Sequence, residues 1–142
     1  IDKQLENIPL GKPISNSKVY IFDCNNQLAP VGVNGEIVLG GDGIPCDSLD
    51  EICAGADAYV QTVIREDLVK LVPNKRFLDI LDYHSTVEQA AQTATKAGIK
   101  KLILTHYVPS MQPGQEDEWR AFAAKYFAGE IVLGDDLTTT TI

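Results

Sequence analysis

The sequence predicts an α/β fold, in which helices pack on a sheet, because apolar runs of strand length alternate with stretches of helical periodicity. The clearest case is residues 84–109, where a capped amphipathic helix leads into a buried strand. The chain has 142 residues, of which 44% are hydrophobic and 23% charged. This size and composition are typical of about one folded domain rather than of a disordered segment.

The first part of the chain predicts a small antiparallel β unit. Residues 19–22 are β-branched and aromatic, and residues 36–40 form a second apolar run after two stretches of turn-forming residues. The chain begins within an element and without Met, so we expect it to be a fragment of a longer protein.

The remainder predicts helices that alternate with strands. Ser85 or Thr86 stands at a helix N-cap, and Ser85 and Glu88 have the spacing of a capping box. Gly98 is placed to end that helix in a left-handed conformation. Residues 65–83 predict a loop with one amphipathic turn. The expected helices are 47–54, 86–97 and 115–127, and the expected strands after residue 40 are 57–61, 100–105 and 130–133.

Charge and cysteine content exclude several classes of function. The net charge of −8 at pH 7 argues against direct nucleic-acid binding, because a phosphate backbone requires a basic partner surface. The sequence shows no apolar run of about 18 residues and no signal peptide, so we expect neither membrane insertion nor secretion. The three cysteines form no CxxC pair, which favours free thiols in a reducing cytoplasm.

Both histidines lie at the ends of predicted elements. His106 follows a buried apolar run and is expected at the carboxyl end of a strand, where layered α/β folds hold ligands and metals. His84 precedes the capped helix. From these residues alone two readings stay open: the histidines belong to a functional site, or they are ordinary polar residues at element ends.

Two short motifs resemble the C-terminal half of metallo-β-lactamase-fold hydrolases, with the ribonuclease Z and arylsulfatase-like branches the most similar. They are His84-Ser85-Thr86 before the helix, and Leu104-Thr105-His106 with Pro109 after the strand. The turn Gly41-Asp42-Gly43 also matches one in those hydrolases. The resemblance implies that residues 36–142 form half of an αββα sandwich, a mixed sheet with helices packed on it.

The same resemblance implies a zinc site and its limits. Asp42 and His106 correspond to metal ligands, and His84 to a residue that assists proton transfer. The hydrolases have a His-Glu pair where this chain has Gln61-Thr62, and their HxHxDH motif has no counterpart here. We therefore expect the isolated chain to be inactive, to hold zinc weakly, and to have a complementary half-domain or a second copy as its partner.

A further stretch, residues 8–43, resembles the adenylation domains of nonribosomal peptide synthetases nearly position by position. The chain thus reads as a chimera, with an adenylation-like β segment over 1–43 and a hydrolase-like part over 36–142, which overlap at 36–43. Two alternatives to a hydrolase lineage stay open. One is a noncatalytic folded module, natural or engineered. The other is a fragment of an amino-acid adenylating enzyme, which would have ATP and an amino acid as partners.

Overall fold

The computed structural model describes residues 37–39 and 43–141. Of these, the residues from 37 to Thr140 belong to one compact unit. The expected strand at 19–22 and most of the adenylation-like stretch 8–43 lie outside the described residues, so both stay predictions, as does the domain boundary. None of the helices within 43–141 has the length and apolar character needed to cross a membrane.

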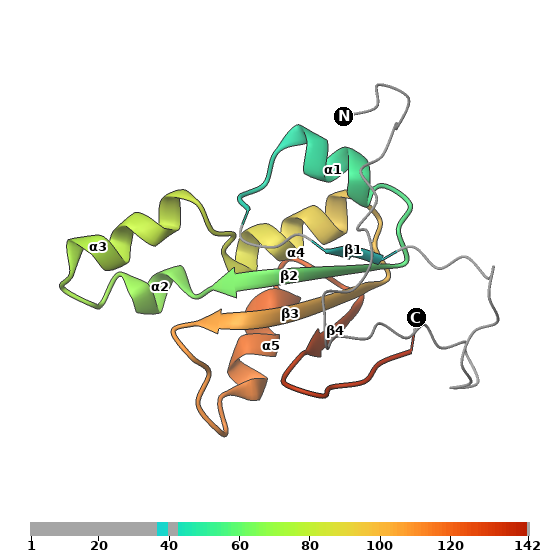
Figure 1. Ribbon diagram of the computed structural model, residues 1–142. Coiled ribbons are helices and arrows are strands. Elements are labelled where there is room, and N and C mark those ends of the chain that lie inside the picture. The colour runs from blue at the N-terminus through green and yellow to red at the C-terminus, as the bar shows by residue number, and fades with distance from the viewer. Residues whose placement is uncertain (1–36, 40–42, 142) are drawn as a thin grey trace, which may run out of the picture. The chain divides into compact units, whose positions relative to one another are not determined.

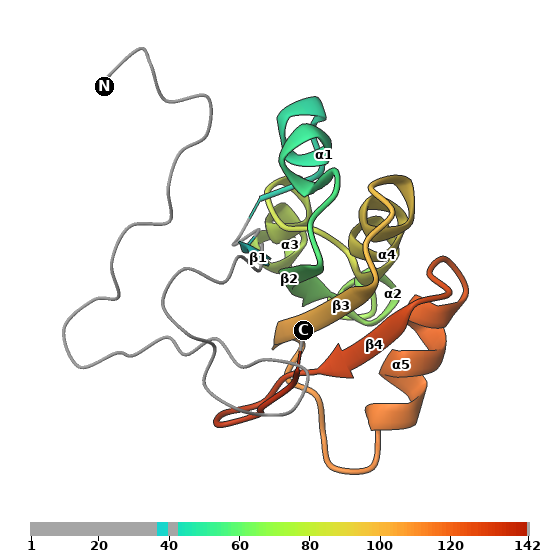
Figure 2. The same ribbon diagram turned by 90° about the vertical axis from the view of Figure 1, so that its right-hand side faces the viewer.

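Four strands form one sheet in the order β1-β2-β3-β4, and helices connect each strand to the next (Figure 1). The helices α1, α4 and α5 all lie on one face of this sheet (Figure 2). The predicted α/β fold class is therefore confirmed. The strands are β1 (Ile37–Leu39), β2 (Ala58–Ile64), β3 (Lys101–Val108) and β4 (Glu130–Leu133), and the connecting helices are α1 (Asp47–Cys53), α4 (Val87–Lys96) and α5 (Glu116–Ala124).

The direction of the strands differs from the expectation in one respect. A mixed sheet was expected, with residues 36–40 in an antiparallel unit, but all three pairings among the described strands are parallel. The connection through α1 explains the parallel pairing of β1 with β2. A helical crossover returns the chain to the edge from which it started, whereas antiparallel neighbours need only a short turn.

The core lies between the sheet and its covering helices. Alanines form much of the face of α4 that packs on the sheet, and their small side chains allow the helix to lie close to β2 and β3. Helix α5 also contributes to the core, where Trp119 is only 1% exposed. The core residues of the two helices are Val87, Ala90, Ala91, Ala94, Trp119 and Ala123, and Phe127 joins them from the chain that follows α5.

One of the two predicted N-cap residues of α4 is confirmed, whereas the predicted capping box is not. Thr86 is the N-cap: its Oγ1 accepts a hydrogen bond from the Gln89 amide (3.1 Å), and Gln89 Oε1 accepts one from the Thr86 amide (2.9 Å). The expected box of Ser85 and Glu88 is wrong because the buried Ser85 hydroxyl donates instead to the carbonyl oxygen of Gly43 (2.5 Å). The predicted left-handed Gly98 is confirmed, with φ of 70°.

Residues 66–82 contain short helices that the sequence did not predict. They are α2 (Glu66–Val69), α3 (Lys75–Leu78) and the 3₁₀ turn η1 (Asp79–Asp82). This segment lies beyond the carboxyl end of β2 (Figure 1). At the other end, α5 stops at Ala124, three residues before the predicted limit of 127.

The capping box gives a direct test of the local structure. We expect Thr86→Ala to lower the free energy of unfolding by about 1 kcal/mol, because one helix amide loses its acceptor. Urea unfolding followed by circular dichroism measures the change. Thr86→Ser keeps the hydroxyl and is expected to unfold close to the wild-type midpoint. Equal losses for the two variants would contradict this role of Thr86.

Candidate functional site

His106 is held in an unusual backbone conformation near the end of β3. Its φ is 47°, in the left-handed region that residues other than glycine rarely adopt. Holding such a residue there costs on the order of 1–3 kcal/mol, and residues of this kind concentrate at functional sites. His106 is also exposed at the carboxyl edge of the sheet. The predicted position of His106 at a strand end is therefore confirmed.

A β-bulge accompanies this conformation. Thr62 pairs with Thr105, but Ile64 pairs with Val108, so β3 contains one extra residue at the position of His106 and Tyr107. Bulges bend a strand and redirect its side chains. The bulge thus explains why His106 departs from the regular alternation of β3 and faces the edge of the sheet.

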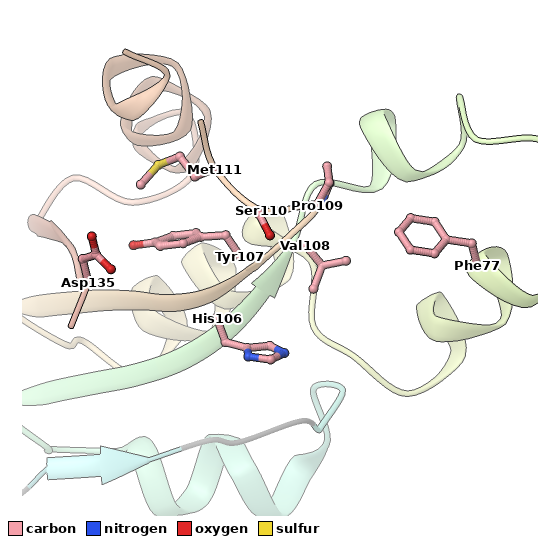
Figure 3. Close-up of a pocket in the computed structure, with 8 residues that line it drawn as sticks. All are labelled: Phe77, His106, Tyr107, Val108, Pro109, Ser110, Met111 and Asp135. Atoms are coloured by element: carbon pink, nitrogen blue, oxygen red, sulfur yellow. The ribbon is translucent and has the colours of Figure 1, made fainter. Parts of the chain in front are cut away.

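A pocket of about 640 Å³ opens beside His106 (Figure 3). Residues from the end of β3 and the loop after it form most of its wall, while α3 and the loop after β4 contribute one residue each. Its apolar side chains include Phe77, Val108 and Met111, and its polar ones include His106, Ser110 and Asp135.

Tyr107 fixes the wall of this pocket on the side of β4. Its hydroxyl lies 2.7 Å from the Leu104 carbonyl oxygen and 3.1 Å from that of Gly134, to which it donates. Its ring contacts Trp119 edge to face, with 5.1 Å between centroids. Burial, and then the nearby Asp135 carboxylate, raise the pKa of Tyr107 to about 12. The hydroxyl therefore stays protonated at neutral pH and remains a donor.

Arg65 fixes the opposite side, where β2 ends. Its amide donates to the Val108 carbonyl oxygen (2.8 Å), next to the pocket. Its guanidinium binds both oxygens of Asp67 (2.8 and 2.7 Å) and one of Glu118 (2.8 Å). Arg65 Cζ also lies 4.7 Å from the ring centroid of Phe122. Arg65, only 4% exposed, thereby joins the end of β2 to α5.

Of the other two predicted site residues, the structure describes His84 but not Asp42. Asp42 lies outside the described residues. His84 is half-buried, and its ring contacts that of Tyr83 with 4.8 Å between centroids. The roles of Asp42 and His106 as metal ligands and of His84 in proton transfer stay predictions. Within the part of the chain that the structure describes, no group of three or more His, Cys, Asp and Glu side chains could hold a metal ion.

The segments that carry the predicted residues nevertheless meet. The hydrogen bond from Ser85 to Gly43 joins the residue after His84 to the residue after Asp42. Strands β1 and β3 also run in the same direction, because each pairs in parallel with β2. The chain therefore leaves β1 at the edge of the sheet where His106 lies.

Gln61, at the position of the hydrolases' His-Glu pair, belongs to the core. Its side chain is fully buried, and its Oε1 accepts a hydrogen bond from the Tyr59 hydroxyl (2.6 Å). Burial of Tyr59 contributes most to raising the pKa of that hydroxyl, which keeps it a donor. Gln61 thus has a packing role in β2.

Sequence reasoning missed the residues that support the pocket. Arg65 follows a strand and precedes two acidic residues, a pattern that gives a weak hint of a local ion pair. No sequence signal identifies its second partner, Glu118, or the contact of Tyr107 with Gly134. These contacts join residues that are 53 and 27 positions apart in the chain.

Comparison with solved structures identifies the class of fold. The chain is similar to a metallo-β-lactamase-fold protein, YhfI from Bacillus subtilis, with a TM-score of 0.53 and 20% identity over 82% of this chain and 44% of that one. The described residues therefore have the architecture of part of a metallo-β-lactamase fold, as expected. No protein-family model matches the chain.

Comparison with curated proteins narrows the relationship. Over 101 residues the chain is 61% identical to a protein named ribonuclease Z from Mycolicibacterium gilvum, a match that covers 71% of this chain and 35% of the relative. It is 57% identical to the ribonuclease Z of Mycobacterium tuberculosis strain H37Rv, of which it covers 37%. The chain thus spans little more than a third of these relatives. The findings support the resemblance to metallo-β-lactamase-fold hydrolases of the ribonuclease Z branch.

The ion pairs of Arg65 with Asp67 and Glu118 predict that the stability of the fold depends on pH. The hydrogen bond from Arg65 is the main cause that lowers the pKa of Asp67 below its usual value. A lowered folded-state pKa means that this carboxylate stabilises the fold at pH values above its unfolded pKa of about 4. The contribution is then lost as the pH falls through the lower folded pKa.

We therefore expect Asp67→Asn to lower the urea midpoint at pH 7, and the difference from wild type to shrink below about pH 4. Glu66→Gln removes a charge one residue away, whose partner is the exposed Lys70, and is expected to have a smaller effect. A pH-independent difference between Asp67→Asn and the wild type would contradict the ion pair as its cause.

Proposed function

We propose that this chain carries part of a metal-dependent hydrolase of the ribonuclease Z type and is inactive by itself. The observation that carries the proposal is the 61% identity over 101 residues to a protein named ribonuclease Z, in a chain with the metallo-β-lactamase architecture. Because the chain spans only 35% of that relative, the activity belongs to a longer assembly.

Within that assembly, His106 and Asp42 are proposed zinc ligands, and His84 the proposed proton-transfer residue. The exposed position of His106 and its left-handed backbone support its role. The described residues do not by themselves form a complete zinc site. Catalytic zinc is usually bound by three protein ligands, and we propose that a complementary half-domain or a second copy supplies the further ligands.

The names of the relatives refer to RNA, and the substrate proposed for the complete assembly is an RNA phosphodiester. The net charge of −8 disfavours contact between this chain and a phosphate backbone. We therefore propose that the complementary part supplies the contacts to the backbone. The alternative of a noncatalytic module predicts no activity in any combination.

The isolated chain is expected to show no hydrolysis of a phosphodiester, a sulfate ester or a β-lactam above the buffer rate, even with added zinc. We expect zinc affinity to be roughly micromolar or weaker at neutral pH, because two inherited ligands give a weak site. Dialysis against chelator followed by metal analysis measures retention. Stoichiometric zinc after dialysis, with hydrolysis lost on His106→Ala, would show that the chain is a self-sufficient enzyme.

Complementation tests the proposed function itself. Adding the separately produced N-terminal part of the Mycolicibacterium gilvum relative is expected to yield phosphodiester hydrolysis. His106→Ala in this chain is expected to abolish that activity, whereas Leu71→Ala, at a side chain that is 78% exposed, keeps it. Activity that survives His106→Ala would refute the assignment of His106.

The adenylation-like stretch predicts a different partner for an alternative function. An adenylating enzyme binds ATP and would be stabilised by it. The phosphate loop and the catalytic lysine of adenylation domains have no counterpart in this sequence. We expect no rise in Tm with ATP, magnesium and mixed amino acids, measured by thermal unfolding. A rise that increases with ATP concentration would instead favour an adenylating-enzyme fragment.

A further inference from the structure

We propose that the pocket beside His106 binds a nucleobase of the substrate, with the ring of Phe77 as its stacking surface. This inference rests on the proposed function and concerns the part of the substrate that lies next to the proposed metal ligand. Four observations on the described residues support it: the chemistry of the walls, their charge, the position of Phe77, and the size of the pocket.

The walls suit a flat apolar ring. Phe77 of α3 points toward Val108 and Pro109 at the end of β3, so an aromatic ring faces an aliphatic wall (Figure 3). Met111 adds a thioether, which contacts aromatic rings favourably. Stacking on an aromatic side chain is the usual way in which proteins hold an unpaired base, and it is tolerant of sequence because every base has a π-face.

The charge of the lining favours a base over a phosphate. None of the lining residues that the structure describes is Lys or Arg, and Asp135 contributes a carboxylate. Without a bound metal, the Asp135 carboxylate disfavours a phosphate in the pocket, whereas a base is uncharged and requires no cation. The negative charge of the chain therefore does not oppose base binding, although it opposes contact with the backbone.

Phe77 belongs to the segment α2 to η1, which extends beyond the end of β2 (Figure 1). It is half-buried, unlike Leu71 in the same segment, which is 78% exposed. Among the residues of this segment, Phe77 lines the pocket and Leu71 does not. Leu71 offers a matched control outside the pocket.

The size of the pocket agrees with this ligand. Its volume of about 640 Å³ lies within the range of about 300–1,000 Å³ that is typical of small-molecule sites. His106 lies in the same pocket, so a base stacked on Phe77 would hold the adjoining phosphodiester close to His106. Phe77 would thereby position the substrate strand.

The chain contains a built-in reporter for this site. Met111 is its only methionine and lines the pocket, so a chain labelled with carbon-13 at the methionine methyl gives a single NMR signal. Trp119 is its only tryptophan and is buried in the core, so its fluorescence shows whether each variant is folded.

The experiment titrates the metal-free full chain with adenosine, with cytidine and with adenosine 5′-phosphate, and uses ribose as the control without a base. We expect both nucleosides to shift the Met111 signal saturably, and ribose to leave it unchanged. Phe77→Ala is expected to weaken binding by about tenfold or more, the usual effect of losing a stacking ring. Phe77→Tyr and Leu71→Ala are expected to bind as the wild type does.

Three results would overturn the inference. The first is no shift of the Met111 signal up to the solubility limit of the nucleosides. The second is equal affinity for the nucleosides in the wild type and in a folded Phe77→Ala variant. The third is tighter binding of adenosine 5′-phosphate than of adenosine. The titration needs neither metal nor hydrolysis. A failed titration with successful complementation would therefore refute the base site alone, and the reverse result would refute the hydrolase function alone.

Discussion

The parallel direction of all four described strands is the constraint on which the rest of this structure depends. Each strand must be joined to the next by a crossover that returns the chain to the edge from which it started, and α1, α4 and α5 make these crossovers on one face. Every strand consequently delivers its carboxyl end to the same edge. The loops after β3 and β4 therefore come together there, and they place His106 and Asp135 around one pocket.

Close packing and a few long-range polar contacts hold the helices and loops in place at that edge of the sheet. The alanine face of α4 allows the helix to approach the sheet, and Trp119 fills the space between α5 and β3. Two buried polar side chains then join the loops: Ser85 binds the Gly43 carbonyl, and Arg65 binds Asp67 and Glu118. Buried polar contacts of this kind favour one arrangement, because alternatives that break them leave more polar atoms without partners.

Most of the secondary structure after residue 43 was predictable from the sequence, because it follows from periodicity that local residues carry. The strand 130–133 and the face of α4 are examples. The capping box of α4 was predicted one residue early because Ser85 bonds to a carbonyl 42 positions away, a contact with no local signal. The four-residue helices α2 and α3 are too short to show a period. The pocket wall was missed because Phe77 and Asp135 are brought to the same pocket only by the topology.

The conformation of His106 is explained by contacts within the protein on both sides of it. Before it, Thr105 is in register with Thr62, and after it Val108 is bound through its carbonyl by the Arg65 amide, so the extra residue of β3 must be accommodated between these two points. Tyr107 is held by the carbonyls of Leu104 and Gly134, which leaves His106 to take up the left-handed turn. The strain at His106 is thus supported by the sheet and by α5 through Arg65. A ligand that binds His106 would meet a backbone already held in this conformation, and would not bear the cost of ordering it.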